Sequence, residues 1–190
     1  MKSVCVFCGA REGASADYVA ASRAFGALIA ARGLALVTGG GALGLMGVVT
    51  DAALAAGAPV VGVIPGSLVE REVAHPKLTE LVVVSDMFER KREMMRRADA
   101  FVALPGGMGT LDEITEVLTW TQLGLFAKPC GLVNVSDYWG PLLAMLDRAV
   151  AQGFLTREHR ALLHVDGDAA RLLDRLAEWK PPLAFAGTRR

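Results

Sequence analysis

The feature that most constrains the fold is an alternation of short apolar runs with longer stretches of helical periodicity. Six runs have the length and composition of strands: Val4–Phe7, Ala35–Thr38, Val60–Ile64, Leu81–Val84, Ala100–Leu104 and Gly131–Asn134. Six stretches predict helices: Ala16–Ala31, Leu45–Ala56, Met87–Ala98, Leu111–Leu123, Tyr138–Ala151 and Ala169–Trp179. Apolar runs that do not alternate with polar residues are typical of strands buried on both faces. The pattern therefore predicts an α/β fold: a doubly wound, mostly parallel sheet flanked by helices, Rossmann-like.

One domain accounts for most of the chain. With 190 residues, of which 53% are hydrophobic, the chain can bury a full core without disulfides or a structural metal. We expect a single Rossmann-like domain over residues 1–180. The last predicted helix ends at Pro181-Pro182, so residues 181–190 are expected to form a flexible tail.

Charge and cysteine content narrow the functional classes. Lys and Arg total 20, as do Asp and Glu, which argues against a nucleic-acid partner and mildly favours a defined oligomer. The sequence contains no stretch of 18 apolar residues, so no membrane span is expected. Three cysteines without an export signal predict a cytoplasmic protein. The three histidines lack metal-ligand spacing, so no metal is expected. No cofactor is expected either.

A first glycine-rich loop, Thr38–Gly47, follows a predicted strand and opens a helix. Gly39, Gly41 and Gly44 match the G-x-G-x-x-G pattern of dinucleotide sites. Such sites also need a carboxylate after the next strand, and that strand ends Val63-Ile64-Pro65-Gly66. Nicotinamide binding is therefore the weaker interpretation. A tight turn for close packing, or an approach to part of a smaller nucleotide, remains open.

A second glycine loop, Pro105–Gly109, predicts a phosphate site. Glycines between a buried strand and a helix let backbone amides approach an anion without interference from Cβ atoms. Thr110 stands at the expected N-cap, and no Lys-Ser/Thr pair follows as in a Walker loop. Thr110 and Glu113 equally fit a capping box, in which Glu113 only closes the helix start.

A basic segment follows the strand Leu81–Val84. Asp86 or Ser85 would cap the next helix and place Arg90 and Lys91 about one turn in. Cations near a helix N-terminus oppose its dipole unless an anion compensates. Arg90 and Lys91 are thus better candidates for ligand contact than Arg96 and Arg97.

These motifs resemble those of a known family. Pro105–Glu113 is similar to the PGGxGTxxE motif of the LOG (Lonely Guy) proteins, and Arg90-Lys91 lies 23 residues before Glu113, as in that family. The family members are cytokinin riboside 5′-monophosphate phosphoribohydrolases, formerly labelled lysine decarboxylases. The resemblance covers about residues 3–146. It departs from the family at Gly9-Ala10-Arg11, where many relatives have Gly-Ser-Ser, and at Phe88 and Asp112.

The resemblance implies a role for each matching residue. Arg90 and Glu113 would be the catalytic pair, and the substrate would be a nucleoside 5′-monophosphate. Other positions would bind that substrate: Glu72, Lys91, Gly106, Gly107, Met108, Gly109, Thr110, Leu111, Asp112 and Thr119. Family members are commonly homodimers, so a homodimer is expected.

The reaction implied is hydrolysis of the N-glycosidic bond, which releases free cytokinin base or adenine and ribose 5-phosphate. Glu113 would stabilise the oxocarbenium-like transition state and accept a proton from water, while Arg90, which stays protonated, would orient it. Glu116 shares a helix face with Glu113 and either binds a ribose hydroxyl or points to solvent.

Three alternatives stay open. One is a general nucleotide 5′-monophosphate nucleosidase in salvage, and another is a sensor or carrier that binds nucleotide without turnover. A pyridoxal phosphate lysine decarboxylase needs a Schiff-base lysine with a partner for the pyridine nitrogen, and neither Lys77 nor Lys91 has such a context.

Overall fold

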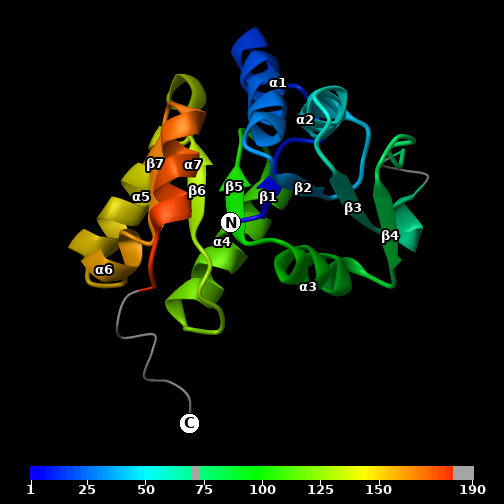
Figure 1. The fold of residues 1–190 in the computed structure, drawn as a ribbon. Coiled ribbons are helices and arrows are strands. Elements are labelled where there is room, and N and C mark those ends of the chain that lie inside the picture. Colours follow the sequence, from blue (N-terminus) through cyan, green and yellow to red (C-terminus); the bar gives the residue numbers. More distant parts are fainter. Residues whose placement is uncertain (70–72, 182–190) are drawn as a thin grey trace.

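The structure is a computed structural model that describes residues 1–69 and 73–181. In this part of the chain seven strands form one sheet, in which every neighbouring pair is parallel (Figure 1). The strand order is β4-β3-β2-β1-β5-β6-β7. The strands are β1 (Ser3–Phe7), β2 (Ala35–Thr38), β3 (Val60–Pro65), β4 (Glu80–Val84), β5 (Ala100–Ala103), β6 (Cys130–Val133) and β7 (Leu163–Asp166). The predicted doubly wound parallel sheet is confirmed.

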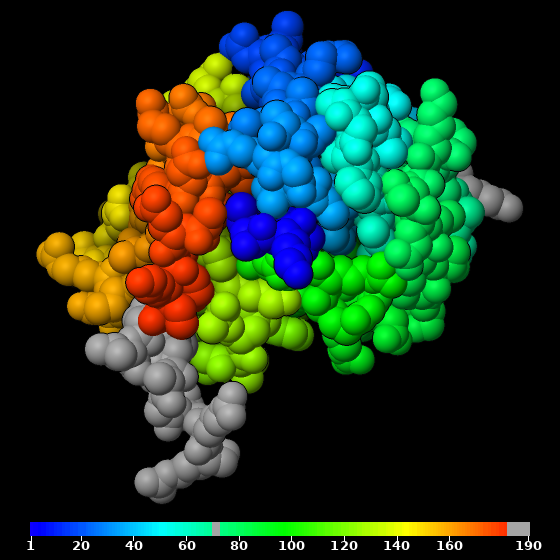
Figure 2. All heavy atoms as spheres, viewed as in Figure 1, coloured from blue at the N-terminus to red at the C-terminus, as the bar shows by residue number. Residues whose placement is uncertain are grey.

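Helices cover both faces of the sheet. They are α1 (Ala16–Ala31), α2 (Gly44–Ala55), α3 (Met87–Arg97), α4 (Met108–Gln122), α5 (Gly140–Ala151), α6 (Arg157–Arg160) and α7 (Ala169–Glu178), with short 3₁₀ turns η1 (Gly66–Leu68) and η2 (Val135–Asp137). Helices α1, α2 and α7 pack on one face, around buried residues such as Phe25 and Leu172. Helices α3, α4 and α5 pack on the other, around Met94 and Ile114. In the space-filling view α1 and α2 lie against each other at the surface (Figure 2).

The predicted elements agree with the structure to within one residue at each end, except in four places. Strand β7 and helix α6 were not predicted, because the Leu-His-Val-Asp sequence of β7 is half polar and only Leu163 is buried. Helix α4 begins at Met108, three residues before the predicted start, and α5 begins two residues late, after η2. Residues 182–190 lie outside the described part, so the flexible tail stays a prediction. No helix among the described residues is long and apolar enough to cross a bilayer.

The order of the strands positions the site. Strand β1 lies between β2 and β5, and the chain leaves β1 and β5 toward opposite faces of the sheet. The loops after these two strands therefore diverge at the carboxyl edge and leave a crevice between them. In open α/β sheets, ligands bind at such a switch point.

Candidate active site

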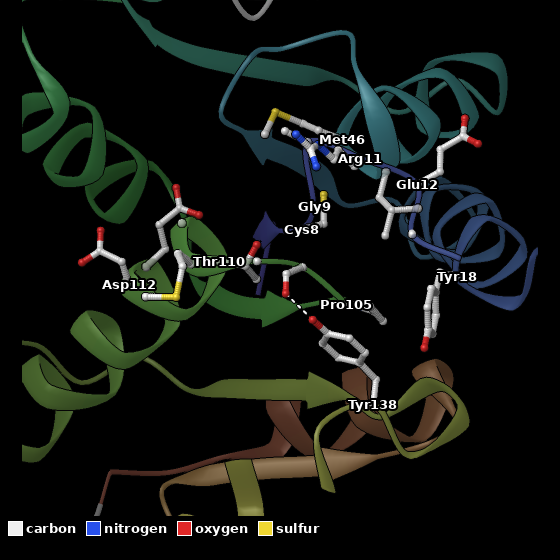
Figure 3. Close-up of a pocket in the computed structure, with 18 of the residues that line it drawn as sticks. Cys8, Gly9, Arg11, Glu12, Tyr18, Met46, Pro105, Thr110, Asp112 and Tyr138 are labelled. Atoms are coloured by element: carbon white, nitrogen blue, oxygen red, sulfur yellow. Dashed lines mark hydrogen bonds between the residues drawn. The ribbon is translucent and has the colours of Figure 1, made fainter. Parts of the chain in front are cut away.

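A cavity of about 540 Å³ lies at this switch point. Its walls are the loop Cys8–Gly13 after β1, the loop Pro105–Gly109 after β5, and side chains from neighbouring helices (Figure 3). Arg90, Thr110 and Glu113 line it together, from α3 and α4. The structure thus brings the basic segment and the second glycine loop to one cavity.

The glycine loop leaves backbone amides open to this cavity. Gly107 is the N-cap of α4, in an extended conformation, and it has no side chain to cap the first-turn amides. A Cβ placed at Gly107 or Gly109 would meet nothing within 4 Å. Unpaired amides at a helix N-terminus bind anions, and here no side-chain hydrogen bond caps them.

Thr110 does not cap the helix, so the predicted N-cap and capping box are wrong. Because α4 begins at Met108, Thr110 is its third residue and Glu113 lies in its second turn. Thr110 is buried, and a Cβ at Gly106 would lie 2.1 Å from its Oγ1 atom. Gly106 is therefore required so that the Thr110 side chain can fold back against the loop.

Arg90 is a buried cation held by backbone carbonyls. Its side chain is 3% exposed; Nε donates to the Val63 carbonyl at 3.1 Å and Nη2 to the Gly39 carbonyl at 2.8 Å. A Cβ at Gly39 would lie 2.0 Å from Nη2, so this position has room only for glycine. The carbonyls beside β2 and β3 thus supply part of the negative partner that the sequence predicted for a cation near a helix N-terminus.

The N-cap of α3 sets the position of Arg90 along the helix. Asp86 Oδ1 accepts a hydrogen bond from the Glu89 amide at 2.8 Å, as the sequence predicted. This hydrogen bond, followed by a smaller one from Ser85, holds the pKa of Asp86 below its ordinary value despite some burial. Asp86 therefore remains a charged cap at neutral pH.

Glu113 and Arg90 both act electrostatically on the buried thiol of Cys5, and Glu113 also acts on that of Cys8. Burial raises the pKa of Cys5 well above its ordinary value; the charge of Glu113 raises it further, and Arg90 opposes this. Burial and then Glu113 likewise raise the pKa of Cys8, which lines the cavity. The carboxylate and the guanidinium therefore lie near one end of β1, and both thiols stay protonated.

The first glycine loop supports the site through close packing. Gly44 is a second glycine of this loop, after Gly39, that close packing requires. It has a left-handed conformation, and a Cβ there would lie 2.3 Å from the Arg11 amide nitrogen. Leu45 and Met46, which follow, line the cavity. The packing interpretation of this loop accounts for its glycines, and its last residues reach the ligand cavity.

Lys91 and Glu116 form an ion pair between α3 and α4. Lys91 Nζ lies 3.0 Å from Glu116 Oε2 and 3.1 Å from Asp112 Oδ2. Burial alone would lower the pKa of Lys91, but hydrogen bonds from Nζ to Glu116 and Asp112 raise it above its ordinary value. Glu116 thus neither points freely to solvent nor lines the cavity.

Some of the other predicted site residues line the cavity and some do not. Gly106, Gly107, Met108, Gly109 and Asp112 line the cavity. Leu111 packs against the core, and Thr119 is exposed on α4, where its hydroxyl donates to the Thr115 carbonyl at 2.7 Å. Glu72 lies outside the described residues.

Several cavity residues were not predicted. Arg11, Tyr18, Met46, Met87 and Tyr138 all line the cavity. Arg11 follows β1, so its place at the switch point could have indicated it. Tyr138 lies beyond η2, and no sequence motif marks it.

A Schiff-base cofactor does not fit this cavity. None of its described lining residues is a lysine: Lys91 pairs with α4, and Lys77 lines a separate pocket beside α1 and α2. Pyridoxal chemistry needs such a lysine, which the described lining of the cavity does not supply.

Comparison with solved structures supports the fold. A molybdenum cofactor binding protein from the phototrophic bacterium Rippkaea orientalis matches with a TM-score of 0.70 at 20% identity, over 93% of this chain and 96% of that one. A molybdenum cofactor carrier protein from Chlamydomonas reinhardtii matches with a TM-score of 0.68 at 22% identity, over 94% and 99%. At these identities the likeness concerns the fold alone.

Comparison with sequences identifies the family. Residues 46–176 match the family described as "Possible lysine decarboxylase". The cytokinin riboside 5′-monophosphate phosphoribohydrolase LOG of Oryza sativa subsp. japonica is 46% identical over 95% of this chain and 74% of its own length. A probable enzyme of the same name from that plant is 49% identical over 95% and 79%, and one from Arabidopsis thaliana is 44% identical over 95% and 83%. With the glycine loop, Arg90 and Glu113 in one cavity, the chain belongs to the LOG family of cytokinin riboside 5′-monophosphate phosphoribohydrolases.

Proposed function

We propose that this protein hydrolyses the N-glycosidic bond of adenosine 5′-monophosphates, including N6-modified ones, to free base and ribose 5-phosphate. The observation that carries the proposal is the shared cavity: an anion-binding helix N-terminus and a carboxylate with an arginine line the same 540 Å³ space. Relatives at 44–49% identity are named for this activity. Both ends of the substrate, phosphate and glycosidic bond, then have a matching group.

The 5′-phosphate would bind the amides at the start of α4. Gly107 and Gly109 leave those amides open, and the helix dipole favours a dianion there. Thr110 supports the loop through its contact with Gly106. Arg11 is a further cation in the cavity wall, in place of the Ser of many relatives, and adds positive charge beside the nucleotide.

Glu113 would then act on the sugar. It lies three residues beyond Thr110, about 4.5 Å along the helix axis, so a substrate anchored at the N-terminus extends its ribose past it. Breaking the bond to the base develops positive charge on the ribose, which a carboxylate stabilises. The same carboxylate accepts a proton from the attacking water.

Arg90 would position Glu113 and stay cationic throughout. A guanidinium cannot serve as a base in a protein, and two of its nitrogens are already bound to the carbonyls of Val63 and Gly39. Fixed in this way, its charge favours the ionised form of a nearby carboxylate. Lys91 would act indirectly, through its ion pairs with α4.

A base-release assay tests this function. Purified protein is incubated with N6-isopentenyladenosine 5′-monophosphate, AMP, another purine monophosphate and adenosine, and free base is measured by chromatography. We expect release from the adenosine monophosphates and little from adenosine, because adenosine leaves the glycine loop empty. Comparable rates for all monophosphates would favour the salvage nucleosidase, and nucleotide binding without base release would favour a carrier.

We also propose a homodimer. Large apolar side chains are exposed on α3, α4 and the turn after α4: Phe88, Met108, Leu123 and Leu125 are between 62% and 80% exposed. Apolar surface of this kind favours association. Light scattering coupled to size-exclusion chromatography should give twice the mass of the 20.1 kDa chain, whereas a monomer would contradict the proposal.

We propose a cytoplasmic location because the three cysteines are not paired in disulfides. Cys5, Cys8 and Cys130 are all buried and free, and free thiols suit a reducing compartment. Fractionation of cells that express the protein would place it, and recovery from an exported fraction would contradict this location.

A further inference from the structure

We infer that Tyr138 is a positioning residue of the phosphate loop, which it holds through a hydrogen bond to the Gly106 carbonyl. This inference builds on the proposed function, because it concerns how the site binds a phosphate. Tyr138 lines the cavity and points at the glycine loop, with its hydroxyl donating to Gly106 O (Figure 3). Its side chain comes from the far side of the cavity, beyond β6 and η2.

The hydrogen bond fixes the orientation of a peptide unit in the phosphate loop. The Gly106 carbonyl and the Gly107 N–H belong to one planar peptide unit, so fixing the carbonyl also fixes the N–H on its opposite side. Both residues of this unit are glycines, which tolerate many backbone conformations. A hydrogen bond from outside the loop is therefore needed to keep one orientation, and accepting it also polarises the Gly107 N–H as a donor.

The backbone before Tyr138 is held in a conformation that the residues would not adopt alone. Ser136 and Asp137 both have left-handed φ angles, 49° and 58°, although neither is glycine. Two consecutive residues of this kind are disfavoured for L-amino acids, so the surrounding contacts must impose them. Asp137 Oδ1 accepts from Asn134 Nδ2 at 2.9 Å, and Ser136 Oγ bonds to Asp17 Oδ2 of α1 at 2.9 Å.

Ring contacts fix the Tyr138 side chain itself. Its ring meets Trp139 edge-on at a centroid distance of 4.9 Å and Tyr18 at 5.6 Å. Trp139 is 2% exposed, and its amide donates to Asn134 Oδ1 at 2.8 Å. The loop after β6 is thus anchored in the core and delivers a rigid hydroxyl to the loop after β5.

The test compares Tyr138→Phe with Tyr18→Phe. Each variant keeps its ring and loses one hydroxyl in the same cavity, but among the described residues only the Tyr138 hydroxyl has a hydrogen-bond partner in the glycine loop. Equilibrium binding of AMP and of inorganic phosphate is measured by calorimetry, and KM and kcat for base release are measured separately. Binding does not require turnover, so it tests this inference even if the proposed hydrolysis fails.

We expect Tyr138→Phe to weaken AMP and phosphate binding about three- to tenfold, the equivalent of one neutral hydrogen bond, and to raise KM by the same factor. The kcat should stay within about twofold, and Tyr18→Phe, whose hydroxyl has no partner in the glycine loop among the described residues, should weaken binding less than Tyr138→Phe does. Should Tyr138→Phe fail to fold, Ser136→Ala is the second variant, because it removes the contact with Asp17. It is expected to weaken binding and raise KM while leaving kcat nearly unchanged. Unchanged binding, equal losses in both tyrosine variants, or a fall in kcat with KM unchanged would overturn the inference.

Discussion

Lys91 of α3 and Glu116 of α4 are joined by an ion pair, with Nζ and Oε2 3.0 Å apart, directly beside the proposed catalytic residues. Lys91 follows Arg90 in the chain, and Glu116 lies three residues after Glu113, on the same helix face. The pair therefore fixes the distance between the two helices that carry the proposed catalytic residues. Its side chains are only 11% and 25% exposed, so solvent screens it less than a surface pair.

A double-mutant cycle measures this coupling. Lys91→Met, Glu116→Gln and the double variant should give a coupling free energy of unfolding of about 1 kcal/mol. The same cycle with Asp112→Asn is the control, because Asp112 is 58% exposed and should couple more weakly. If Lys91 instead contacts substrate, Lys91→Met would raise KM without a loss of stability.

Gly109 allows stability and affinity to be separated. A Cβ at Gly109 meets nothing within 4 Å and the residue is helical, so Gly109→Ala should stabilise the fold by about 0.5–1 kcal/mol. The added methyl group would project into the cavity, and we expect KM for the monophosphate to rise about tenfold or more, because phosphate loses its amide contacts. Thermal denaturation and steady-state kinetics check the two effects.

Gly106→Ala is the contrasting variant. Its Cβ would lie 2.1 Å from Thr110 Oγ1, so this variant should lose stability as well as affinity. A Gly109→Ala protein with unchanged KM would show that phosphate binds elsewhere.

Glu93 makes stability depend on acid pH. Hydrogen bonds from Arg96 and then Arg97 outweigh burial and lower its pKa from an ordinary value of 4.5 to about 2. The ionised form is thus favoured in the folded state, and its stabilising contribution is complete above pH 4.5 and lost as pH falls toward 2. The difference in unfolding free energy between wild type and Glu93→Gln should therefore shrink across this range.

Chemical denaturation at several pH values measures that difference. Glu178→Gln serves as the control, since Glu178 is exposed at the end of α7 and has no ion pair among the described residues. A constant difference between pH 6 and pH 3 would contradict the assigned ion pairs.

The sequence predicted the sheet well because its central strands are continuous apolar runs. Strand β7 escaped prediction because an edge strand is half exposed and reads as Leu-His-Val-Asp. The start of α4 was misplaced since Thr110 is a favoured N-cap type, whereas Gly107 occupies the cap with no side chain at all.

The sequence predicted the site residues that lie in motifs, but not the contacts between segments that are distant in the chain. Gly106 to Gly109, Arg90 and Glu113 could be found because motif and spacing mark them. Arg90 lies 27 and 51 residues from its two carbonyl partners, Val63 and Gly39, and Tyr138 lies 32 residues from Gly106. Only the fold brings these residues together. Thr119 matched the family by position, and the structure places it exposed on α4, outside the set of described residues that line the cavity.

The central claim, that Glu113 performs the chemistry on a substrate anchored by its phosphate, is tested most directly by single-turnover base release in Glu113→Gln. Glu116→Gln, with the same change three residues along the same helix, is the matched comparison and should slow base release far less than Glu113→Gln, because Glu116 does not line the cavity. We predict that Glu113→Gln binds AMP with near wild-type affinity but releases base at least about a hundredfold more slowly, a typical loss for a general base. Near-normal release by Glu113→Gln would contradict the account.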